Sequence, residues 1–188
     1  MIKLTRIQLM ISVLFVFAMC AVVVLGGKSF QASKPSEGKL LKIEGQVSVN
    51  GTAASSGATV FSDSTVTTAA RSSAVVSLGK LGRVEVLPDS TMKLNFSDSS
   101  VSPSMLEQGR VRLSSSSNVT VKVTTKDGEV LATGNQRNEF TVDTSCGNTF
   151  VAVVKGKVEL RAGSTVKQIA AGNQDSAGQA RPGCTPAP

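Results

Sequence analysis

The chain has no histidine, tryptophan or tyrosine, and phenylalanine supplies all of its aromatic residues, which make up only 4% of 188 positions. Without histidine, neither a Ser-His-Asp triad nor a Cys-His pair can form within this chain. A zinc site would depend on only three cysteines, and no acidic segment has the spacing of a calcium-binding loop. We therefore expect no enzyme, no cofactor, no metal and no small-molecule substrate.

One short motif still suggests catalysis, because Ser90 and Lys93 have the Ser-x-x-Lys spacing of penicillin-binding enzymes. That motif needs a helix to bring the hydroxyl and the amine onto one face. Here it follows Pro88 and lies in a run typical of a strand, which would send the two side chains to opposite faces. The serine cluster Ser114 to Ser117 is interpreted as a loop.

Charge is scarce at the N-terminus, where the 21 residues from Ile7 to Gly27 carry none and follow Lys3 and Arg6. A helix of this length can span a hydrocarbon layer of roughly 30 Å, whereas the apolar part of a cleaved signal peptide is shorter, at about 7–15 residues. We expect an uncleaved single-pass anchor in the inner membrane, with the C-terminal domain in the periplasm or outside. Cleavage, which would release the domain to the periplasm, remains the alternative.

Composition divides the chain into five parts. Residues 1–6 form a short cytoplasmic N-terminus, 7–27 the transmembrane anchor or signal segment, and 28–39 a linker rich in Ser, Pro, Lys and Gly. Residues 40–174 form a β domain, and 175–188 form a Pro-rich C-terminal tail. The β domain has about 135 residues, which is enough for one hydrophobic core.

A glycine motif, Gly-x-Val-x-(Val/Leu), begins at Gly45, Gly82, Gly109 and Gly156. Each copy reads as a glycine turn followed by a short strand in which apolar and polar residues alternate. The copies are unequally spaced, so the repeat is degenerate. This pattern predicts an all-β fold, an irregular β-solenoid or curled sandwich of short strands, although a series of unrelated hairpins would carry the same motif.

The expected strands alternate with short turns, and no sustained helical period occurs among them. They cover residues 39–50, 57–61, 64–68, 74–78, 83–87, 91–96, 110–114, 119–124, 129–132, 138–143, 149–154, 157–162 and 165–170.

Two cysteines, Cys146 and Cys184, lie in the domain expected outside the cytoplasm, where disulfides form and persist. A bond between them would tether the tail, and the chain-entropy model gives it about 4 kcal/mol. Two unpaired surface thiols are the alternative, because the sequence does not show the distance between them.

Positive charge is in excess, at +7 for the chain and +5 without its first 27 residues. Strand parity turns five basic side chains toward solvent, where they are candidates for an interaction face: Arg110, Arg112, Lys155, Lys157 and Arg161. This face could contact an envelope protein, an anionic envelope polymer or lipid headgroups. A solvated strand face that guards against aggregation is the simpler interpretation. Nucleic acid is not expected, because no Tyr or Trp is available for stacking.

The order of many weak signals in the β domain resembles the extracytoplasmic domain of the FecR family. These segments are Ile43–Val47, Val66–Leu78, Arg83–Ser90, Leu106–Val111, Val121–Thr125, Asn138–Val142, Thr149–Leu160 and Ala170–Gly172. The resemblance implies a periplasmic β module of the kind that relays signals from an outer-membrane transporter to a sigma factor. We expect the module without its cytoplasmic anti-sigma domain, since only Met1 to Arg6 precede the apolar segment.

These observations predict a non-enzymatic, membrane-anchored β module that acts in protein interaction or in sensing envelope signals. The alternative is a passive structural or assembly component of the cell envelope, in which the β domain is a spacer.

Overall fold

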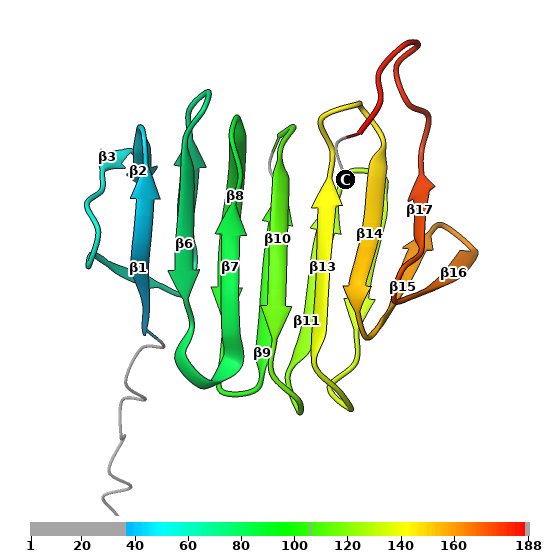
Figure 1. Cartoon of the computed structure of the whole chain (residues 1–188), viewed down its shortest axis with the longest axis horizontal. Coiled ribbons are helices and arrows are strands. Elements are labelled where there is room, and N and C mark those ends of the chain that lie inside the picture. The colour runs from blue at the N-terminus through cyan, green and yellow to red at the C-terminus, as the bar shows by residue number, and fades with distance from the viewer. Residues whose placement is uncertain (1–36, 106, 187–188) are drawn as a thin grey trace, which may run out of the picture. The chain divides into compact units, whose positions relative to one another are not determined.

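The computed structural model describes residues 37–105 and 107–186, and these form two β-sheets with a shared core (Figure 1). Sheet A has eight strands. In spatial order these are β17 (Gln174–Ala177), β14 (Thr149–Lys155), β13 (Asn138–Asp143), β10 (Arg110–Ser115), β7 (Gly82–Val86), β6 (Ser73–Ser77), β1 (Glu37–Glu44) and β4 (Thr59–Phe61).

Sheet B lies behind sheet A in Figure 1 and has nine strands. In spatial order these are β16 (Thr165–Ala170), β15 (Lys157–Ala162), β12 (Gly128–Ala132), β11 (Thr120–Thr125), β9 (Ser100–Met105), β8 (Ser90–Phe96), β5 (Ser64–Thr68), β2 (Val47–Val49) and β3 (Thr52–Ala53). Neighbouring strands are antiparallel except β9 and β11, which run parallel.

The core is formed by every second residue of the strands, as the alternation predicts. In β10, Val111 and Leu113 are buried while Arg110 and Arg112 are only partly covered. In β15, Val158 and Leu160 are buried between more exposed neighbours. Small aliphatic side chains dominate the interior, and Phe140 is its largest fully buried member. The all-β prediction is confirmed in the form of two sheets around one core.

The glycine motif marks corners of the chain. At Gly45 the chain leaves sheet A for sheet B, at Gly109 it returns to sheet A, and at Gly156 it crosses to sheet B again. Gly82 instead begins β7, directly after the only helical element among the described residues, the 3-10 turn η1 (Gly79–Leu81). The strand expected over residues 39–50 is therefore two strands, β1 and β2, which lie in different sheets.

Two further differences concern strands with weak sequence signals. β9 was not predicted, because it contains Pro103 and several polar residues. Its ladder to β11 has no registered pair at Ser102 or Pro103, since proline lacks the backbone N–H. β17 extends three residues past residue 174, where the β domain was expected to end. β17 pairs with β14 through backbone hydrogen bonds, and its mostly polar side chains lack the apolar alternation that would have predicted a strand.

The predicted segment 7–27 lies outside the described residues. Within residues 37–105 and 107–186, no helix has the length and hydropathy needed to cross a membrane.

A lysine on β16, at the edge of sheet B, contacts β17, at the edge of sheet A. Lys167 pairs in register with buried Leu160, so its side chain lies on the inner face of sheet B. Its Nζ contacts Asp175 Oδ1 at 2.7 Å and donates to the Ser176 carbonyl at 2.8 Å. An inward-pointing charge on an edge strand hinders pairing with another chain. Two hydrogen bonds lower the pKa of Asp175. The larger effect comes from Lys167 and the smaller from the Ser176 backbone N–H.

Replacing Gly82 with alanine should destabilise the domain more than the same change at Gly51. A Cβ at Gly82 would collide with the carbonyl oxygen of Ser114, on the strand paired with β7, and φ is +128°. At Gly51, φ is also positive at +78°, but no atom lies within 4 Å of the added carbon. We expect Gly82→Ala to cost about 2 kcal/mol more than Gly51→Ala in urea unfolding. Equal losses would show that the close approach to Ser114 is unimportant.

Removing the Lys167 charge should change how stability depends on pH. Because the folded pKa of Asp175 is lowered, its stabilising contribution is present above the unfolded value of about 3.9 and is lost as pH falls through the folded pKa. Both side chains are about 40% exposed, so the effect is small, below about 1 kcal/mol. Unfolding of Lys167→Met and of the wild type should differ at neutral pH and converge in acid. A constant difference down to acid pH would contradict this role.

Candidate interaction surface

The five basic residues predicted as one face are divided between the two sheets. Arg110 and Arg112 lie on β10 and Lys155 ends β14, all in sheet A, whereas Lys157 and Arg161 lie on β15 in sheet B. The corner at Gly156 separates the two groups. The five residues therefore do not form one continuous face. Strand parity predicts whether a side chain points into or out of its own sheet, but it does not predict to which sheet the strand belongs.

Register places a mixed row of side chains across the outer face of sheet A. Lys42 opposes Val75, Val75 opposes Glu85, and Glu85 opposes Arg112, whose Nη1 contacts Glu85 Oε2 at 3.2 Å. At the end of this row, Lys42 pairs with Glu44 at 2.6 Å. Their mutual hydrogen bond raises the pKa of Lys42 and lowers that of Glu44. These exposed pairs orient the charges and contribute little to stability.

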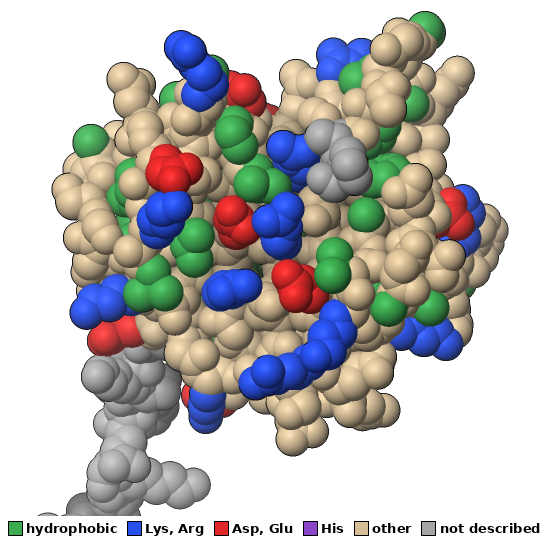
Figure 2. Space-filling model, viewed as in Figure 1, with side chains coloured by type: hydrophobic (Ala, Val, Ile, Leu, Met, Phe, Trp, Pro, Cys, Tyr) green, Lys and Arg blue, Asp and Glu red, His purple; other side chains and the backbone are tan. Residues whose placement is uncertain are grey.

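Other cations on sheet A have no carboxylate partner within the described residues. Arg83, Arg110 and Lys155 make no ion pair there, and Arg83 and Lys155 are exposed. We call the outer side of sheet A that carries Arg83, Arg110, Arg112 and Lys155 the cationic face. Figure 2 shows basic side chains over the middle and lower part of this face, with acidic ones between them.

The outer side of sheet B has most of its cations neutralised. Lys93, Lys122 and Arg161 each contact a carboxylate, from Asp63, Glu129 and Glu159 respectively, at 2.6 to 2.8 Å. Free positive charge is thus concentrated on sheet A, where it is available to a partner. Arg83 was missing from the sequence prediction, although its place after Gly82 in the second motif copy has the parity of Arg110 after Gly109.

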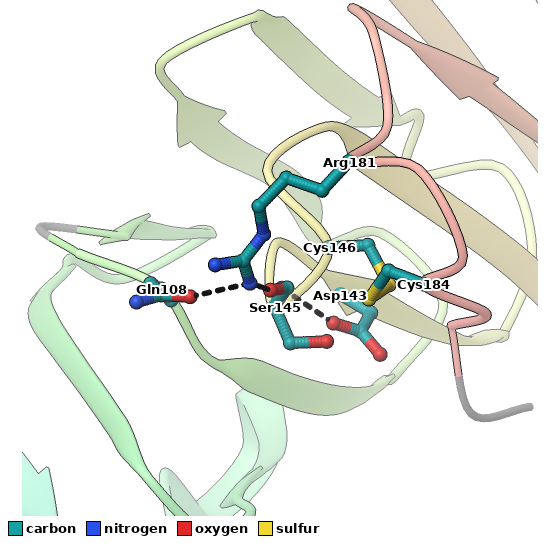
Figure 3. The surroundings of a disulfide bond; sticks show 6 residues. All are labelled: Gln108, Asp143, Ser145, Cys146, Arg181 and Cys184. Carbon is teal, nitrogen blue, oxygen red and sulfur yellow. Dashed lines mark hydrogen bonds between the residues drawn. A yellow bond between two sulfur atoms is a disulfide. The ribbon is translucent and has the colours of Figure 1, made fainter.

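A disulfide joins Cys146 to Cys184, with a Cα–Cα distance of 5.5 Å (Figure 3). Cys146 lies in the turn between β13 and β14, and Cys184 lies in the segment after β17. The side chain of Arg181 extends across the turn and donates to the Ser145 carbonyl and to Gln108 Oε1. The disulfide therefore holds the tail against the β13–β14 turn, and Arg181 also fastens it to Gln108 in the β9–β10 connection.

Ser90 and Lys93 do not form a catalytic pair. Both lie on β8, where Ser90 is buried and Lys93 is partly exposed and contacts Asp63. The Ser90 hydroxyl donates to backbone carbonyls of Pro88 and Arg110 and accepts the Arg110 N–H at 2.8 Å. This serine fastens β8 in sheet B to β10 in sheet A.

Comparison with known proteins identifies a family match and a fold match. The sequence profile of the FecR family, described as FecR protein, matches residues 64–159, just over half of the chain. Two crystal structures of a candidate anti-sigma factor from Parabacteroides distasonis align with 58% of this chain, at 18% identity and a TM-score of 0.50. The chain spans 52% of that protein's length, and at this identity the likeness concerns the fold. No curated protein matches the chain.

Breaking the disulfide should lower stability by releasing the tail. In Cys184→Ser the loop of 38 residues is no longer closed, and we expect a loss of about 2–4 kcal/mol in urea unfolding. Wild-type protein unfolded with a reductant should match the variant, which serves as the control. If the oxidised wild type and Cys184→Ser unfold at the same urea concentration, the tether does not stabilise the domain.

Proposed function

Because this chain belongs to the FecR family, we propose that it is a non-enzymatic module that acts in protein interaction or in sensing envelope signals. The family and the anti-sigma neighbour both favour a regulatory role over a catalytic one. The observation that carries the proposal is the asymmetry of charge, since sheet A presents unpaired cations while sheet B pairs most of its own.

A surface of this kind suits recognition better than it suits stability. Charges that are not neutralised within the protein steer and orient a complementary partner, and they contribute mainly to specificity and association rate. The pair between Arg112 and Glu85 restrains one guanidinium on the outer face of sheet A, and Arg110 and Arg83 lie on the same face. The cationic face therefore offers fixed and free positive charges on a rigid β scaffold.

The location follows from the apolar segment 7–27, which we propose holds the β domain at the inner membrane, with the domain in the periplasm or outside. The bond between Cys146 and Cys184 supports an oxidising compartment. In this arrangement the cationic face would meet a protein of the envelope. A passive spacer would need no such partner.

Neutralising the cationic face should abolish capture of a partner. We would isolate the full chain with Arg110→Gln and Arg112→Gln from solubilised membranes and measure which proteins accompany it in stoichiometric amounts. The matched control is Lys157→Gln with Arg161→Gln, which also removes one unpaired and one paired cation, but from sheet B. We expect the partner to be lost only with the sheet A variant.

Two outcomes would contradict the proposal. If the wild-type chain brings no stoichiometric partner, the spacer function is favoured. If both double variants lose the partner equally, binding depends on overall charge and not on the cationic face.

A further inference from the structure

A groove is lined by residues at one end of sheet A. At this end the chain turns between β6 and β7, β10 and β14 end, and β13 begins (Figure 1). Its charged lining consists of Arg83, Arg137 and Lys155 against the single carboxylate of Glu139. None of these four side chains takes part in an ion pair in the part of the chain that the structure describes. The groove is thus an open site with an excess of positive charge.

The backbone around the groove is held in place, so the site is formed before a ligand arrives. Ser116 N–H donates to the Leu81 carbonyl at 3.0 Å, which fixes the end of β10 to η1. The Asn138 side chain donates to the carbonyls of Thr133 and Gln136 and accepts the Lys157 N–H. These bonds fix the loop before β13, which carries Arg137. A preformed site loses less conformational entropy on binding.

The lining favours one kind of occupant. Glu139 pairs in register with Ser114 and with Lys155, so a carboxylate lies among the cations and disfavours a densely charged polyanion such as a phosphate-rich polymer. An exposed apolar side chain, Leu41, which is 57% exposed, lines the same groove and offers a contact that such a polymer does not use. A peptide with carboxylates and an apolar side chain complements both the cations and Leu41.

Building on the proposed function, we infer that this groove binds an acidic, partly apolar peptide segment of the protein partner. Arg83 and Lys155 bind its carboxylates, and Leu41 packs against an apolar side chain.

The test uses the purified full chain and a fluorescein-labelled peptide of alternating Asp, Glu, Leu and Val, with binding followed by anisotropy. We expect saturable binding that weakens with salt. Arg83→Glu with Lys155→Glu should weaken it at least about tenfold. The matched control, Arg71→Glu with Lys157→Glu, makes the same charge change outside the groove lining and should bind like the wild type.

One single variant separates a binding role from a structural one. Glu139→Gln removes the repelling carboxylate, so the same peptide should bind more tightly, which loss of folding would not produce. If Glu139→Gln leaves affinity unchanged or lowers it, the inferred orientation of the acidic peptide is wrong.

Three further measurements test whether the groove prefers an acidic peptide to other ligands. They also show whether this inference can fail while the proposed function holds. A peptide with Asn and Gln in place of the acids should not bind. Tighter binding to phosphatidylglycerol vesicles than to the peptide would overturn the inference in favour of a lipid surface. If a membrane partner is captured but is retained by Arg83→Glu with Lys155→Glu, the groove is not its site and only this inference fails.

Discussion

The burial of every second strand residue between two sheets is the constraint on which this structure depends. Val111, Leu113, Val158 and Leu160 fill a common interior, and the residues between them are forced to the outside. Because the interior consists of small side chains, it must be assembled from many strands and has few large anchors besides Phe140. The same parity that forms the core therefore exposes the arginines and lysines proposed to meet a partner.

Glycine corners make this arrangement possible. When the chain turns at Gly45, Gly109 and Gly156, it changes sheets within a few residues, and a Cβ at each position would press against a neighbouring strand or turn. Two of the proposed recognition features lie beside such corners, since Lys155 precedes Gly156 and Arg110 follows Gly109. Arg83 follows Gly82 at the start of β7. The fold thus places exposed positive charge next to backbone that strand pairing holds in position.

The two ends of β13 have different chemistry. Near Asn138, side-chain hydrogen bonds fix a loop beside an open basic groove. Near Asp143, the turn that carries Cys146 is covered by the tail through the disulfide and Arg181. One end is therefore covalently secured, while the other is open to a ligand. This division is consistent with a module that is fixed as a scaffold and binds at its exposed end.

Sequence alone determined that the chain is all-β, which strand positions are buried, and that the chemistry of histidine-dependent enzymes is absent, because these follow from local periodicity and composition. It also indicated Cys146 and Cys184 as a candidate pair. It did not reveal β9 and β17, since their strands are specified by backbone pairing with β8 and β14 and not by apolar alternation. Only the tertiary structure decided that Arg110 and Arg161 belong to different sheets and that Arg83, Arg137 and Lys155 share one groove, because sheet membership depends on hydrogen bonds between residues far apart in the chain.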